Sequence, residues 1–278
     1  MDLPSLYRLI DLQPEMADRL ARVGGALDME RLEPCLAQLL ERDAAARGYE
    51  GLRALLGEDA GGLGMLYCQL ECARRAWERY RERGIGPAVY RDTMRCFPRF
   101  LAECRERNGR IFFDRGWWTY RQTSMGLFRL GTLEYELQER DGERSVAVHI
   151  PSDADLSPAA VDGSLDRADR FFRAQAPAYG EGGYSCHSWL LSPALTPLLS
   201  GDSRILAFQR RFRIVREDPG DREYIRWLFR VPEGTAAEAF PEGTSLQRGV
   251  KALVLGGGAV GSALGVMDRG RIWKGEGV

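Results

Sequence analysis

The stretch LFRLGTLEYELQERDGERSVAVHI, residues 127–150, decides the fold class because its apolar residues alternate. The alternation that includes Phe128 resumes at Leu133 shifted by one residue, which predicts a β-bulge at Gly131-Thr132. Asp141-Gly142 lies between two alternating runs and favours a tight turn. The stretch therefore predicts two antiparallel strands joined as a hairpin.

The residues before this stretch show only helical spacing, and we expect no strand of five or more residues before about Gly109. Gly84 and Gly86-Pro87 predict the end of one helix. Asp28 predicts the N-cap of another helix, and Pro98 predicts a kink in a third. The three apolar stripes are Leu63, Leu66, Tyr67, Leu70, Ala73, Trp77 and Tyr80; Tyr90, Met94, Phe97, Leu101 and Cys104; and Leu32, Leu36, Leu39 and Leu40.

The residues after the hairpin predict a mixture of helices and strands. Ser157-Pro158 combines a hydroxyl cap with a first-turn proline and predicts a helix to about Phe172, and a strand is expected over 183–191. A short helix is predicted over 193–199. Two late strands, over 208–214 and 224–230, are expected to be joined by a turn at 218–221. We expect a sheet of at least five strands after Gly126.

The end of the chain predicts a last helix followed by a glycine-rich stop. Thr244-Ser245-Leu246-Gln247 is a capping box, so a helix is expected to run to about Leu255. Gly256, Gly258 and Gly261 satisfy a G-x-G-x-x-G pattern, but a dinucleotide site needs a strand before it and a helix after it. A helix stop is the better interpretation.

Composition excludes several classes of protein. With 39 Lys+Arg against 40 Asp+Glu, the formal net charge is −1, which favours neither nucleic acid nor an anionic membrane as a partner. No apolar run is long enough to span a bilayer, and six cysteines without framework spacing are typical of a reduced compartment. Cys68 and Cys72 lack a second ligand pair, so we expect no metal site. We expect a cytoplasmic protein that acts on a small molecule.

The order of these elements resembles the GNAT-type acyltransferase fold. The local sequence resembles a bacterial family with a helical N-acyltransferase N-terminal domain and a GNAT-like C-terminal domain. The resemblance implies an α/β protein with a helical domain over 1–120, followed over 121–278 by a mixed, mostly antiparallel sheet with flanking helices. The matching blocks are residues 128–136, 149–152, 156–157, 186–193, 208–209 and 244–248.

The resemblance implies acyl-CoA as co-substrate, and one segment departs from the expected pattern. In active GNAT enzymes a glycine-rich loop holds the coenzyme A pyrophosphate at a helix N-terminus. The corresponding residues 151–158 contain no glycine, and Asp153 and Asp155 would repel a phosphate. The residues proposed to bind the cofactor are Ile150, Ser152, Ser157, Arg210 and Arg211; the two arginines are expected at a strand edge.

The candidate catalytic residues gather on the strands that the resemblance makes neighbours. His149 or Glu134 is the candidate base for the acceptor, and Tyr184 or Ser188 the candidate donor to the departing thiolate. Cys186 is a candidate acyl acceptor. His187 and Trp189 are candidate substrate contacts, and we expect His149 and the 186–188 segment to line one cavity.

Each candidate has a structural alternative. The histidines can be structural residues and Cys186 a buried core residue. Glu134 and Glu136 can form the solvent-exposed face of a strand, and Trp189 can be a domain-interface anchor. Three functions therefore remain open: transfer of an acyl group from a thioester to an amine or similar acceptor; a non-catalytic GNAT-like binding module; and a cysteine-dependent transferase or hydrolase that uses Cys186 with His149.

Overall fold

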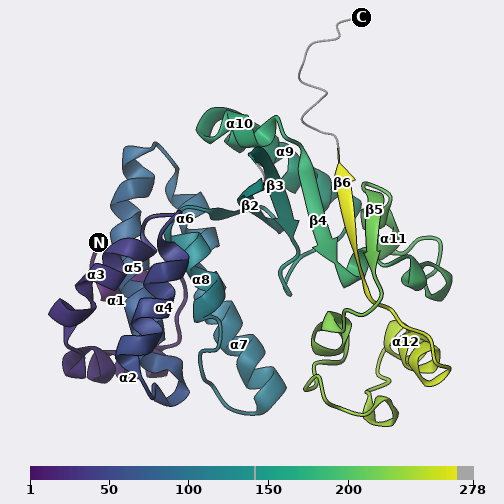
Figure 1. Ribbon diagram of the computed structural model, residues 1–278, viewed down its shortest axis with the longest axis horizontal. Coiled ribbons are helices and arrows are strands. Elements are labelled where there is room, and N and C mark those ends of the chain that lie inside the picture. Colours follow the sequence, from purple (N-terminus) through teal and green to yellow (C-terminus); the bar gives the residue numbers. More distant parts are fainter. Residues whose placement is uncertain (141, 268–278) are drawn as a thin grey trace, which may run out of the picture. The chain divides into compact units, whose positions relative to one another are not determined.

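The computed structural model describes residues 1–140 and 142–267 (Figure 1). The chain divides into two compact units, Met1–Arg129 and Leu130–Val278. In the described part of the chain none of the helices combines the length and apolar character needed to cross a bilayer.

The first unit is helical, and α5 (Leu63–Glu82) is its central element. α5 packs against α2, α3 and α8, and the helix is followed by Gly84 at φ 67°. Of its predicted apolar stripe, Leu66, Leu70, Ala73 and Tyr80 are buried, and Leu63, Tyr67 and Trp77 are half-buried. Before β1 the described residues contain no strand, which confirms the predicted helical half. The other helices are α1 (Leu3–Leu9), α2 (Pro14–Ala26), α3 (Met29–Leu39), α4 (Ala45–Leu56), η1 (Ala60–Gly62), α6 (Pro87–Met94), α7 (Cys96–Asn108) and α8 (Gly116–Thr123).

The helix termini confirm one sequence prediction and correct another. Asp28 caps α3 by accepting a hydrogen bond from the backbone N–H of Arg31 at 3.1 Å. The predicted kink at Pro98 is wrong: the chain breaks at Arg95, between α6 and α7. Pro98 lies in the first turn of α7, where its missing N–H leaves no intrahelical bond unmade.

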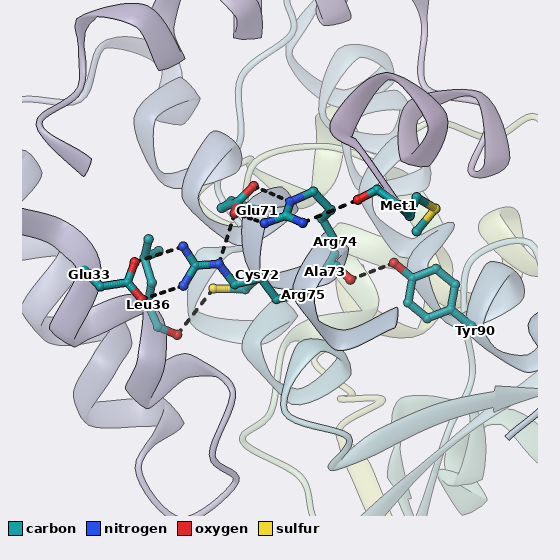
Figure 2. A network of polar contacts seen from close by, with 9 residues as sticks. All are labelled: Met1, Glu33, Leu36, Glu71, Cys72, Ala73, Arg74, Arg75 and Tyr90. Atoms are coloured by element: carbon teal, nitrogen blue, oxygen red, sulfur yellow. Dashed lines mark hydrogen bonds and ion pairs between the residues drawn. The ribbon is translucent and has the colours of Figure 1, made fainter. Parts of the chain in front are cut away.

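A network of ion pairs joins α3 to α5 (Figure 2). The Glu71 carboxylate accepts hydrogen bonds from Arg74 at 2.6 and 2.8 Å and from Arg75 at 3.0 Å. Arg75 also donates two bonds to Glu33 on α3, at 2.6 and 2.9 Å. Arg74 reaches the carbonyl oxygen of Met1 at 3.4 Å. The network therefore ties two helices and the start of the chain to one buried carboxylate.

Glu71→Gln is expected to destabilise the protein at neutral pH by about 1–2 kcal/mol, since both guanidinium groups stay partly hydrated. Burial opposes ionisation of Glu71, but the hydrogen bonds from Arg74 and Arg75 outweigh it and the pKa is lowered. A lowered folded-state pKa gives stability above the unfolded-state pKa, which is lost as pH falls through the folded-state value. Urea unfolding at pH 7 and pH 3 should therefore show a smaller loss on acidification in the variant than in the native protein. An equal loss in both would contradict this role.

From Leu127 onward the chain forms a six-stranded sheet in the order β1-β2-β3-β4-β6-β5, which confirms the expectation of at least five strands. β2 and β3 form the predicted antiparallel hairpin, β3 and β4 are parallel, and the β4–β6 and β5–β6 pairs are antiparallel. Asp141 of the predicted turn lies outside the described residues. The strands are β1 (Leu127–Leu130), β2 (Leu133–Arg140), β3 (Glu143–His149), β4 (Tyr184–Ser188), β5 (Arg213–Asp218) and β6 (Ser262–Met267).

The crossover from β3 to β4 is α9 (Pro158–Gln175), which lies behind these strands in Figure 1. The Tyr135 and Ser164 hydroxyls are 2.9 Å apart, and Tyr184 donates a hydrogen bond to Asp169 at 2.8 Å. Tyr135 also packs edge-on against Phe172. α9 therefore covers the sheet face that carries these two tyrosines. The remaining helical elements are α10 (Pro177–Gly180), η2 (Trp189–Leu191), η3 (Pro193–Leu198), α11 (Arg204–Gln209), η4 (Ile225–Phe229), η5 (Ala237–Ala239) and α12 (Ser245–Leu255).

Two connections near the sheet differ from their predictions. The expected bulge at Gly131-Thr132 is a two-residue connection between β1 and β2, with Gly131 at φ 86°. The strand expected over 183–191 ends at Ser188, where the side chain of Ser188 accepts a hydrogen bond from the N–H of Leu190 and starts η2. A side-chain cap therefore ends this strand early.

The two predicted late strands are wrong for most of their length. Phe208 lies in α11, which is capped by Ser203, and only β5 from Arg213 is extended. The segment expected over 224–230 is η4, a π-helical turn. Packing explains both differences, because Phe208 is buried and η4 contributes to a second core. That core consists of Trp189, Leu195, Tyr224, Ile225, Phe229, Phe240, Val250 and Val260.

The capping box and the glycine stop are confirmed. Thr244 and Gln247 make both reciprocal bonds at the start of α12, which ends at Leu255 before Gly256. The segment after the glycines is not a helix but β6, the strand between β4 and β5. No dinucleotide-binding arrangement of strand, loop and helix exists here.

Candidate functional site

The candidate site lies where β3 and β4 stop pairing. Their register contains two residue pairs, Val146↔Tyr184 and Ala147↔Ser185. β3 continues to His149 and β4 continues through Cys186 to Ser188 beyond the last pair. Beyond the last pair the two strands keep their other neighbours: His149 pairs with Glu134 on β2, and residues 186–188 pair with β6.

The predicted site residues on β2, β3 and β4 lie on two opposite faces of the sheet. Tyr184 shares the face that α9 covers, and Cys186 and Ser188 alternate onto that face as well. Glu134 and His149 are directly opposite each other on β2 and β3, and both point to the other face. His187 on β4 also belongs to this second face. The two histidines therefore share a face, and Cys186 does not.

His149 contacts a carboxylate on the neighbouring strand β2. Its Nε2 lies 2.8 Å from the Oε2 atom of Glu136, and both side chains are largely buried, with 25% and 16% exposed. The sequence placed Glu136 with Glu134 on one strand face, as a possible general base or as a solvent-exposed pair, and did not link it to His149. Its i+2 spacing from Glu134, combined with the β2–β3 register, was the signal that could have placed it beside His149.

The predicted residues on the α9 side already have structural contacts. Burial raises the pKa of the Cys186 thiol to about 12, so the thiol form dominates at neutral pH. The Tyr184 hydroxyl is bound to Asp169, and Trp189 belongs to the second core. The Ser188 oxygen accepts from Leu190, which leaves its own hydrogen available for donation. Their functional roles stay predictions.

The segment between β3 and α9 is organised around Asp155. Ser157 is the N-cap residue of α9, but the predicted hydroxyl cap is wrong, because its side chain donates to Asp155 at 2.9 Å instead. Asp155 also accepts from the N–H of Ser157 at 2.9 Å and from Arg204 at 3.2 Å. The backbone hydrogen bond and then the hydroxyl of Ser157 lower the pKa of Asp155. An arginine therefore partly neutralises the acidic segment.

The arginines predicted to bind the cofactor lie at a helix rather than at a strand edge. Arg210 is the C-cap of α11 and is exposed. Arg211 donates to Asp162 in α9 at 2.8 and 3.0 Å, and to the carbonyl oxygen of Pro158 at 3.4 Å. Arg211 thus lies beside the first turns of α9, near its N-cap residue Ser157. Ile150 and Ser152 are in the connection between β3 and α9.

The structure also describes the cysteines that were considered as metal ligands. Burial raises the pKa of Cys68 to about 12 and raises that of Cys72 further. Across residues 1–140 and 142–267, no group of three or more His, Cys, Asp or Glu side chains is placed to hold a metal ion.

Comparison with family models identifies both units. Residues 1–125 match the N-acyltransferase N-terminal domain, and residues 127–267 match the GNAT-like C-terminal domain. The chain belongs to the acyltransferase family defined by these two domains. The resemblance seen in the sequence and the expected fold class are therefore confirmed. No curated protein matches the chain.

Solved structures of acyltransferases share the fold over nearly the whole chain. One is a complex with decanoyl-CoA and teicoplanin, at 23% identity and a TM-score of 0.69. A second is a complex with decanoyl-CoA, at 22% identity and a TM-score of 0.70. A third is an acyltransferase mutant in complex with octanoyl-CoA, at 22% identity and a TM-score of 0.69. Each comparison covers 96% of this chain and 99% of the other. At these identities the likeness establishes the fold.

Proposed function

We propose that this protein transfers an acyl group from an acyl-CoA thioester to an amine or similar group of a small-molecule acceptor. Its family and fold support this proposal. The observation that carries the location of the site is the β3–β4 pair, which stops after Ala147↔Ser185 and leaves His149 beyond it. A thioester entering between the two strands would lie beside His149 on β3 and Ser188 on β4.

In the proposed reaction the acceptor nitrogen attacks the thioester carbonyl carbon and the carbon–sulfur bond breaks. His149 takes the proton from the acceptor, and the leaving sulfur departs as a thiolate that a hydroxyl stabilises. Ser188 is better suited to that hydroxyl role than Tyr184, because Tyr184 would have to leave Asp169. His149 and Ser188 belong to opposite faces of the sheet, so base and donor would flank the inserted thioester.

Acyl transfer is tested by incubating the protein with acyl-CoAs of increasing chain length and a panel of small-molecule amines. Release of coenzyme A and the acylated product are measured by chromatography and mass spectrometry. The proposal expects coenzyme A release that depends on both substrates. Saturable binding without turnover would favour a binding module, and a covalent acyl group on Cys186 would favour the cysteine-dependent alternative.

We expect the Asp153→Asn/Asp155→Asn double variant to bind coenzyme A about tenfold more tightly than the native protein. A carboxylate repels a nearby phosphate, and because Asp155 is exposed, solvent and salt screen most of this repulsion. Arg204 already offsets part of the Asp155 charge, which reduces the gain. Titration calorimetry measures the dissociation constant, with Asp221→Asn as a charge-matched control. An unchanged constant would place the phosphates away from this segment.

A further inference from the structure

We propose that Glu136 is a positioning residue that fixes the ring of His149 in one tautomer and makes Nδ1 its basic nitrogen. The catalytic consequence rests on the proposed acyl transfer, whereas the tautomer itself does not. The proposal starts from the 2.8 Å contact between His149 Nε2 and Glu136 Oε2, which joins two largely buried side chains.

The strand register explains why Glu136 can hold this ring. Glu134 is directly opposite His149, and Glu136 is opposite Ala147, two residues back along β3. Both carboxylates share a sheet face with the imidazole. The small side chain of Ala147 leaves room for the ring to lean along β2 towards the diagonal carboxylate, which is within reach of a long side chain. The ring is therefore held by a diagonal cross-strand contact.

The chemistry of the pair then selects the tautomer. An ionised carboxylate has only hydrogen-bond acceptors, and a neutral imidazole has one N–H donor and one acceptor nitrogen. Pairing with Glu136 thus places the proton on Nε2 and the lone pair on Nδ1. When Nδ1 takes a proton from the acceptor, the imidazolium that forms is stabilised by the same carboxylate. Glu136 acts through His149 and needs no contact with the substrate.

The tautomer can be read directly because His149 and His187 are the only histidines in the chain. Two-bond proton–nitrogen correlation spectra of ¹⁵N-labelled protein, recorded above pH 8, distinguish Nε2–H from Nδ1–H imidazole; His187→Gln assigns the signals. We expect His149 to show the Nε2–H pattern in the native protein. Glu136→Ala should lose that bias, and Glu136→Gln, whose amide oxygen can still accept, should retain part of it. A native His149 in the Nδ1–H form would overturn the proposal.

Kinetics supply the second measurement. Glu136→Ala should lower kcat by about 10- to 100-fold, less than the roughly 10²- to 10⁴-fold that the general base itself contributes, with KM for acyl-CoA within about twofold. Glu136→Gln should recover part of the rate. Glu139→Gln, on the same strand but paired with Arg144, is the matched control and should leave kcat unchanged. Melting curves verify that the variants fold.

An unchanged kcat in a folded Glu136→Ala protein would overturn the positioning role. If the native protein transfers no acyl group, the proposed function fails, and the spectra alone decide whether Glu136 sets the tautomer of His149. The two failures are therefore distinguishable.

Discussion

His149→Ala is expected to lower kcat/KM for acyl transfer by about 10²- to 10⁴-fold, the contribution of a well-placed general base. The substitution should leave the melting temperature within a few degrees of the native value. His149 is the last residue of β3 and a quarter of its side chain is exposed, so its loss leaves a space that opens to solvent. Steady-state kinetics and a thermal melt on the same preparation measure the two effects together.

Ser145→Ala is the matched control, because Ser145 lies on the same strand and sheet face but within the β2–β3 ladder. It should retain native kcat/KM. A His149→Ala protein that keeps native activity would remove His149 from the mechanism and move the role of base to Glu134. A large fall in melting temperature with proportionate loss of activity would make the histidine a structural residue.

Gly182→Ala is expected to destabilise the protein by about 3 kcal/mol or more, because a backbone clash cannot be relieved by a rotamer change. A Cβ atom at this position would lie 1.6 Å from the carbonyl oxygen of Arg144 on β3. The adjacent Gly183 carbonyl accepts the bond from the N–H of Val146 at 3.1 Å that begins the β3–β4 pair. The alanine must therefore push the start of β4 away from β3.

Gly163→Ala, in the same unit, is expected to change the stability of the protein in the opposite direction. Gly163 lies in α9, and a Cβ atom there meets nothing within 4 Å, so alanine should stabilise the protein by about 0.5–1 kcal/mol. Thermal melts should show a fall of roughly 6–12 °C for Gly182→Ala and a small rise for Gly163→Ala. Gly182→Ala with native stability would contradict the close approach of the two strands.

The parts of the fold that could be predicted are those in which local pattern and tertiary packing agree. The stripe of α5 and the capping box of α12 specify helices, and alternation specifies the β2–β3 hairpin. The segments 208–214 and 224–230 also alternate, but Phe208 and Ile225 are buried in helical turns. Packing of their aromatic and aliphatic side chains outweighed a short-range pattern that is compatible with both structures.

The adjacency of β3 and β4 was predictable from the sequence, but the contacts of His149 were not. Chain order placed His149 and the 184–188 segment on neighbouring strands, and β3 and β4 are neighbours. The pairing of Glu136 with His149 depends on the register of the hairpin and on which residue lies diagonally across it. A shift of one residue would have turned this carboxylate to the other face, and sequence spacing alone does not fix such a shift.

The long segment of chain between β4 and β6 affects the order in which the strands of the sheet assemble during folding. β2, β3 and β4 are joined by a hairpin and a single helical crossover, whereas all of residues 189–261 lie between β4 and its other neighbour, β6. Closing so long a loop carries an entropic cost, and non-local contacts of this kind form slowly. The second core, which includes Trp189 near one end and Val260 near the other, brings the two ends of this loop together. We therefore expect the strands that carry His149 and Cys186 to associate early, and β6 to join them once the second core has condensed.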